Sequence, residues 1–218
     1  GLSNLQPRKE VNEDSLFLME LDSWQLQGCG WAKMSPQIAV FTNFMEDHLN
    51  YYEKGGKNKE EAMELYFADK ANIFLRQEES GVLVTTPEVF EMAGSFAAGK
   101  DITLGQEVVL ADASVLPEDC LLAMPGEHNR LNAALAYEAL KAVSLEDEEI
   151  FTALASFSGV EGRLQKVGEV NGVPIYNDNN ATTPAATAAG LRSVADGQNV
   201  VLLVGGSDKN LPLGELTK

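Results

Sequence analysis

The sequence predicts an α/β fold built on a mainly parallel β-sheet. Short apolar runs bounded by polar or turn residues alternate with segments of helical periodicity along the whole chain. Polar residues gather directly after several of these runs, where an open parallel sheet binds its ligands. Alternation of this kind is typical of helices covering a parallel sheet, so we expect that architecture here.

The first part of the chain supplies most of the sheet. Its expected strands are short apolar runs at Leu16–Leu21, Ile38–Thr42, Gly81–Thr86 and Glu107–Leu110. Its clearest helical patterns are the series Leu131, Leu135, Ala139 and Val143 and the series Ile150, Ala153, Leu154 and Phe157, and a further helix is expected around Lys59–Lys70. The last series follows Ser144-x-x-Asp147, which we interpret as a capping box.

The pattern resets around residues 158–162, so we divide the chain into a partial central domain (1–159) and a partial Rossmann-like domain (160–218). Asn171-Gly172 predicts a hairpin turn between two apolar runs. A further strand is expected at Val200–Val204, followed by a helix that begins near Leu213. The second unit is short, and we expect it to be incomplete at its C-terminus.

Composition excludes several classes of function. The net charge of −17 disfavours nucleic acid and anionic membranes as partners. No apolar stretch is long enough to insert into a membrane. Cys29 and Cys120 lie far apart without metal-type spacing, which indicates a reducing, cytoplasmic location. Any phosphate ligand would require local positive groups or bound cations.

The segment Tyr176–Thr187 is the most informative stretch. An apolar run ends in a polar cluster, and Thr183-Pro184 then provides an N-cap and a first helical residue. The free N–H groups and positive dipole end of such a helix favour an anionic ligand. Asp178 disfavours an anion unless it manages a proton or a cation, so this corner indicates catalysis on a phosphate or carboxylate.

Unusual polar residues also follow the strands of the first unit. Glu20 is either a solvated edge residue or a magnesium-binding carboxylate at a strand tip. His48 is either a surface histidine or part of a site, although Mg²⁺ prefers oxygen ligands to imidazole. Lys70 shares a helix face with Met63 and Tyr66, so it either snorkels to water or forms a carbamate with carbon dioxide.

Two further motifs have alternative interpretations. Asn129 and Asn132 lie three residues apart at a helix start, and they are either N-caps or readers of a base edge. Gly205-Gly206 with Lys209 is either a plain turn or a close-approach site that offers a positive charge to a carboxylate.

Taken together, these segments resemble the Mur ligases, the ATP-dependent amide-bond-forming enzymes of peptidoglycan precursor synthesis. The matching segments occur in the family's order: Glu20–Leu26, Thr42–Leu49, Tyr66–Lys70, Gly126–Asn132, Gly162-Arg163, Asn177-Asp178 with Ala181-Thr182, and Gly205-Gly206 with Lys209. Within the family, the Asn-Asp-x-x-Ala-Thr corner resembles the D-glutamate-adding branch. That branch joins D-glutamate to UDP-N-acetylmuramoyl-L-alanine through an acyl phosphate, and full-length members are expected to be monomers.

The resemblance implies a role for each candidate residue. Glu20 and His48 would hold Mg²⁺, and Lys70, as a carbamate, would help to place a second cation. Asn129 and Asn132 would face the nucleotide of ATP. Arg163 and Asp178 would engage ATP from the second unit, while Thr182 and Lys209 would hold D-glutamate. The cations would also resolve the charge problem of so acidic a chain.

The sequence departs from the family pattern in two places. Asn179 and Asn180 occupy positions where Ser and Lys are expected, so a positive charge near the amino-acid site is missing. No Gly-x-x-Gly-Lys-[Ser/Thr] phosphate loop occurs, so we expect the chain to be a middle fragment, inactive alone. The alternatives are a ligase for another amino acid, such as a folylpolyglutamate-synthase-like protein, and a non-catalytic binding module.

Overall fold

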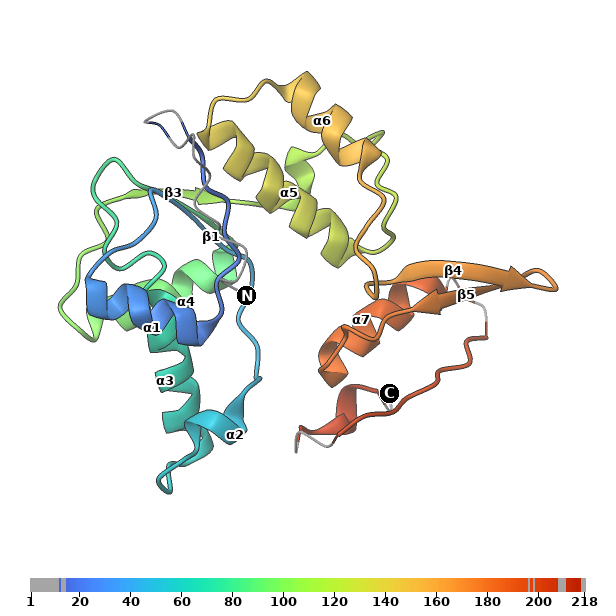
Figure 1. Cartoon of the computed structure of the whole chain (residues 1–218), viewed down its shortest axis with the longest axis horizontal. Coiled ribbons are helices and arrows are strands. Elements are labelled where there is room, and N and C mark those ends of the chain that lie inside the picture. Colours follow the sequence, from blue (N-terminus) through green and yellow to red (C-terminus); the bar gives the residue numbers. More distant parts are fainter. Residues whose placement is uncertain (1–11, 13–14, 196, 198, 208–210, 217–218) are drawn as a thin grey trace.

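The structure, a computed structural model, describes residues 12, 15–195, 197, 199–207 and 211–216. Helices and strands alternate through the first part of these residues, and a hairpin with one long helix follows (Figure 1). In chain order the elements are α1 (Ser23–Ala32), β1 (Ile38–Phe41), α2 (Leu49–Tyr52), α3 (Lys59–Ala71), β2 (Val82–Thr85), α4 (Pro87–Ala98), β3 (Glu107–Leu110), the 3-10 helix η2 (Ala113–Val115), α5 (Glu127–Ala142), α6 (Asp147–Ser156), β4 (Gln165–Val170), β5 (Val173–Asn177), α7 (Pro184–Ala195) and the 3-10 helix η3 (Leu213–Glu215).

The predicted parallel sheet is confirmed for β1, β2 and β3. The strands lie in that order, with Val40 opposite Val84 and Val84 opposite Val109. Each connection between them contains at least one helix, as parallel pairing requires. The side chain of Thr85 is buried in the central strand, where its hydroxyl donates to the carbonyl oxygen of Phe41 at 2.7 Å.

Helices cover both faces of this sheet, and the period-two alternation of the strands decides what each face contacts. On one face, Phe41 and Leu83 pack with Phe67 and Phe74 from the α3 region. On the other face, Val84 packs against Leu135 of α5. Because both faces are covered, most strand residues are apolar, which is typical of parallel sheets, while Glu107 and Leu110 at the two ends of β3 are exposed.

The second unit consists of the β4–β5 hairpin and α7 (Figure 1). Val170 pairs with Val173, and the turn residues Asn171 and Gly172 have φ angles of 51° and 80°. This is the predicted two-residue turn with both φ angles positive. The predicted cap is also confirmed, since the Thr183 side-chain hydroxyl accepts from the backbone N–H of Ala186 at 3.2 Å.

Several local predictions are wrong. Leu16–Leu21 and Val200–Val204 form no strand, because neither segment pairs with the described strands, and their side chains are largely exposed, with Leu18 98% accessible. The capping box of α6 is formed by Glu146 and Glu149, not by Ser144 and Asp147. The helix expected from Leu213 is a single 3-10 turn in the residues that the structure describes.

Among the described helices, none combines the length and the apolar character needed to cross a bilayer.

Candidate active site

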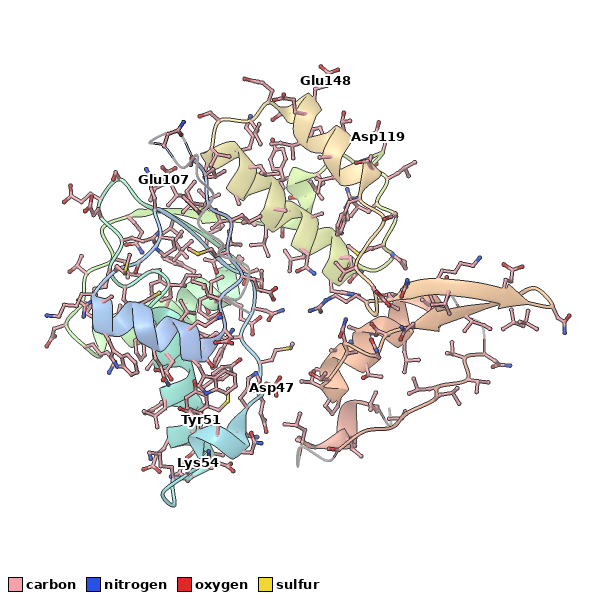
Figure 2. The ribbon with its side chains drawn as sticks, viewed as in Figure 1. Asp47, Tyr51, Lys54, Glu107, Asp119 and Glu148 are labelled. Carbon is pink, nitrogen blue, oxygen red and sulfur yellow. The ribbon has the colours of Figure 1, made fainter. Side chains whose placement is uncertain are left out.

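A cavity of about 440 Å³ lies beyond the carboxyl end of β1. Its wall contains Glu20 from the segment before α1, Asp47 from the loop after β1, Lys70 from α3 and Thr183 from the cap of α7. Figure 2 shows Asp47 on the side of the first unit that faces α7. The cavity therefore collects chemistry from segments far apart in the sequence, and it lies where open α/β sheets bind ligands.

Lys70 is the cation of this cavity. Its ammonium group lies 5.7 Å from the centre of the Tyr66 ring, and burial lowers the pKa of the lysine. Asp22, Glu20 and Asp47 oppose that shift through their negative charge. The amine thus lies among carboxylates in a partly desolvated position. Its neutral, nucleophilic form is therefore more populated at neutral pH than in an exposed lysine.

His48 lies beside the cavity but does not line it. It has a left-handed backbone, with φ 57°, at the start of α2. Its ring packs edge-on against Trp24 at 5.0 Å and Tyr66 at 5.8 Å, and its Nε2 lies 3.8 Å from Asp47 Oδ2. Aromatic packing therefore sets the orientation of this imidazole next to the carboxylate that does reach the cavity.

A second cavity, of about 420 Å³, adjoins the first and shares Met45 and Thr183 with it. Pro184 at the first turn of α7 and Leu211 form much of its remaining wall. The first cavity thus contains Lys70, and the second lies at the N-terminus of α7 beside Leu211, Pro212 and Gly214. The positive dipole end at the start of α7 suits a carboxylate or phosphate.

A third, smaller cavity of about 120 Å³ lies beside α5 and includes both Asn129 and Asn132 in its wall. Neither is the N-cap of α5, which is Gly126, so the N-cap interpretation of these residues is wrong. Asn129 is buried and donates from its side-chain amide to the Pro125 carbonyl oxygen at 2.7 Å. Asn132 is exposed at the cavity, so its amide is open to a ligand.

The start of α5 also meets the second unit. Gly126 approaches the Ser193 hydroxyl of α7 so closely that a Cβ atom would not fit. Burial lowers the pKa of the neighbouring His128, while the charge of Asp178 raises it and that of Arg192 lowers it. Asp178 is thereby placed close to the helix turn that carries Asn129.

The amino-acid sequence also matches the model of a known protein family. The sequence model described as the Mur ligase middle domain matches residues 3–140. The chain belongs to the Mur ligase family.

The most similar relatives are enzymes of one kind. The UDP-N-acetylmuramoylalanine--D-glutamate ligase of Geobacillus kaustophilus is 34% identical, over 99% of this chain and 49% of its own length. The ligase of the same name from Acetivibrio thermocellus is 31% identical, over 99% of this chain and 47% of its own. The chain thus spans about half the length of the curated relatives it matches. A solved murein peptide ligase from Psychrobacter arcticus covers 75% of this chain with a TM-score of 0.48 and 16% identity, the match covering 36% of that protein.

The structure brings part of the predicted Mur ligase site together. Glu20 and Lys70 share the large cavity, and Asn129 and Asn132 share the small one. Thr182 is exposed and lines none of these cavities, whereas its neighbour Thr183 lines two of them. Lys209 lies outside the described residues.

Sequence reasoning left three contributors without a role. Asp47 and Asp22 face Lys70, and Thr183 faces the same cavity from the second unit. Thr183 was predicted only as the N-cap of α7, and Asp22, which caps α1 in the structure, was given no role. Asp47 directly precedes His48 at a strand end, and that position was the available signal.

The cavity also fits the Mg²⁺ that the family implies. Within the described ranges no group of three His, Cys, Asp or Glu side chains is poised as a complete metal site. Mg²⁺, however, is usually bound by one or two protein carboxylates together with phosphate oxygens and water. Glu20 and Asp47 provide two such carboxylates in one cavity.

Proposed function

We propose that the full-length protein containing this chain is an ATP-dependent ligase that adds D-glutamate to UDP-N-acetylmuramoyl-L-alanine. The names of the most similar relatives support this substrate pair. The observation that carries the proposal within the structure is the placement of Lys70, a partly desolvated amine facing Glu20, Asp22 and Asp47 at the wall of a cavity.

The proposed chemistry is the one that the resemblance to the Mur ligases implies. ATP phosphorylates the L-alanyl carboxylate, the amine of D-glutamate attacks the resulting acyl phosphate, and inorganic phosphate leaves. Bound Mg²⁺ would screen the repulsion between ATP and a carboxylate. Glu20 and Asp47 would hold it, with His48 oriented beside Asp47. Lys70, as a carbamate, would add a further oxygen ligand at the same wall.

The remaining cavities suit the other two substrates. D-glutamate would occupy the cavity at the N-terminus of α7, where Thr182 lies next to the cap residue and Lys209 follows in sequence. The adenine of ATP would enter the small cavity, where Asn132 offers an exposed amide. Asp178 and Arg163 would contact ATP from the second unit.

The proposal includes the division of the chain near residue 160, with the central domain before it and a Rossmann-like domain after it. The separate sheets β1–β3 and β4–β5 support this division. We also assign the reaction to the cytoplasm and to a monomer, with no nucleic acid partner. The unpaired Cys29 and Cys120 and the net charge of −17 support the location and the lack of a nucleic acid partner.

A coupled assay on the full-length protein tests the function. ATP hydrolysis should require both UDP-N-acetylmuramoyl-L-alanine and D-glutamate, and radiolabelled D-glutamate should enter the nucleotide-linked product. Turnover with another amino acid, but not with D-glutamate, would replace the substrate assignment. No amino-acid-dependent hydrolysis at all would favour a binding module.

A further inference from the structure

The turn before β4 presents Arg163 between two buried residues. Gly162 and Leu164 are buried, whereas Arg163 is exposed. Both flanking residues have left-handed backbones, with φ angles of 75° and 44°. That conformation is unfavourable for a leucine, so the turn requires contacts that hold it.

The segment after β5 provides these contacts. Asp178 Oδ1 accepts from the backbone N–H of Leu164 at 2.9 Å. The side-chain amide of Asn180 donates to the Glu161 carbonyl oxygen at 3.0 Å, and the Asn180 backbone N–H donates to the Gly162 carbonyl oxygen at 3.0 Å. The turn is therefore bonded to residues 178–180 on both sides of Arg163.

The side chains of Asn179 and Asn180 also lie very close to Gly162 in this turn. A Cβ atom on Gly162 would collide with the Asn179 side-chain oxygen and would lie 2.9 Å from Asn180 Nδ2. The two asparagine side chains thus lie over Gly162, and Asn180 is directed at the turn instead of toward the cavity at the N-terminus of α7, whose wall does not include it.

We propose that Asn180 is a positioning residue for Arg163, acting on the nucleotide side of the site and not on the amino acid. This assignment rests on the proposed function, because it takes Arg163 as a contact of ATP. An asparagine amide bonds a carbonyl oxygen through a short, two-torsion side chain, so it fixes the turn at this distance. This hydrogen bond gives a structural role to Asn180, which stands where a lysine is expected.

Kinetics of the full-length ligase test the proposal with an isosteric variant. Asn180→Asp keeps the shape but loses the N–H donor and sets a carboxylate against a carbonyl oxygen. We expect the KM for ATP to rise roughly three- to tenfold, with the KM for D-glutamate within about twofold of wild type. Gly162→Ala should likewise raise the KM for ATP and leave the KM for D-glutamate unchanged. Arg163→Ala removes the proposed ATP contact itself, so it should give the largest rise in the KM for ATP. The matched control is Asn199→Ala, an exposed asparagine of the same unit, which should leave both constants unchanged.

Amide hydrogen exchange in the full-length protein gives a second measurement that needs no catalysis. Asn180→Asp should speed exchange at Leu164 and at residue 180 itself, and Asn199→Ala should not. A raised KM for D-glutamate with an unchanged KM for ATP would overturn the proposal, as would unchanged exchange at both amides. If wild type shows no D-glutamate-dependent turnover, the proposed function fails, and the exchange measurement still decides whether Asn180 holds the turn.

Discussion

The phenolic hydroxyl of Tyr52 donates to Asp69 Oδ2 at 2.9 Å, and the side-chain amide of Gln27 donates to the same oxygen at 2.6 Å. Asp69 directly precedes Lys70 on α3, Tyr52 lies on α2 and Gln27 on α1. One carboxylate oxygen therefore links three helices: α1 follows Glu20, α2 follows Asp47, and α3 contains Lys70. Burial, together with the charge and hydrogen bond of Asp69, raises the pKa of Tyr52, so the phenol stays a donor.

Removing the hydroxyl of Tyr52 should weaken the packing of α1, α2 and α3 and so destabilise the protein. Tyr52→Phe should lower the free energy of unfolding by about 1–2 kcal/mol, because a part-buried hydrogen bond to a carboxylate is lost while the ring remains. Urea denaturation followed by circular dichroism measures it. Tyr51→Phe is the matched control: in the described residues its hydroxyl has no hydrogen-bond partner, so it should cost less than about 0.5 kcal/mol. Equal losses in the two variants would contradict the role of Asp69.

Two helix glycines should respond in opposite ways to alanine. Gly94→Ala in α4 should stabilise the protein by roughly 0.5–1 kcal/mol, since a Cβ there meets nothing within 4 Å and alanine favours helix. At Gly190 in α7 a Cβ would lie 2.7 Å from Asp178 Oδ2. That carboxylate is held by the Leu164 N–H, so Gly190→Ala should destabilise despite the same gain in helix propensity. Urea midpoints of the two variants that move in the same direction would contradict this contact.

The elements that sequence predicted well are those decided by local chemistry. β3 has the predicted bounds, the Asn171-Gly172 turn has two positive φ angles, and Thr183 caps α7. The turn and the cap depend on neighbours a few residues away, whereas β3 also has β2 as a parallel partner. Leu16–Leu21 and Val200–Val204 have equally apolar sequences but form no strand, because a strand also needs a partner to complete its hydrogen bonds.

The same distinction applies to the candidate site. Glu20 and Lys70, which the family resemblance assigned to one site, do line the same cavity, although the strand expected before Glu20 does not form and Lys70 lies on a helix. The sequence did not predict that Asn180 turns toward Glu161, since that bond joins residues 19 apart across a hairpin. Nor did it separate Thr182 from Thr183, because which of two adjacent threonines faces a cavity depends on the exact start of α7.

The contact between α5 and α7 should be sensitive to acid. Burial lowers the pKa of His128 below its ordinary value of 6.5, so the unfolded chain binds this proton more readily than the folded protein. Stability is therefore complete above pH 6.5 and declines as pH falls below it. His128→Gln should remove this part of the decline. Thermal melting between about pH 7.5 and pH 5 measures it, and parallel profiles for wild type and variant would exclude the histidine as the cause.

The amine of Lys70 should be essential to catalysis in the full-length ligase. Lys70→Ala removes the carbamate that we propose at the cavity wall, so turnover should fall by at least about 10³-fold. Added acetate or a similar short carboxylate should restore part of the rate by supplying the missing oxygen ligand. Lys100→Ala, at an exposed lysine just after α4, is the matched control and should turn over like wild type, without any response to acetate. Near-normal turnover in Lys70→Ala would show that this lysine has no part in the mechanism. Loss of turnover without rescue by acetate would indicate that Lys70 acts as an ammonium group and not as a carbamate.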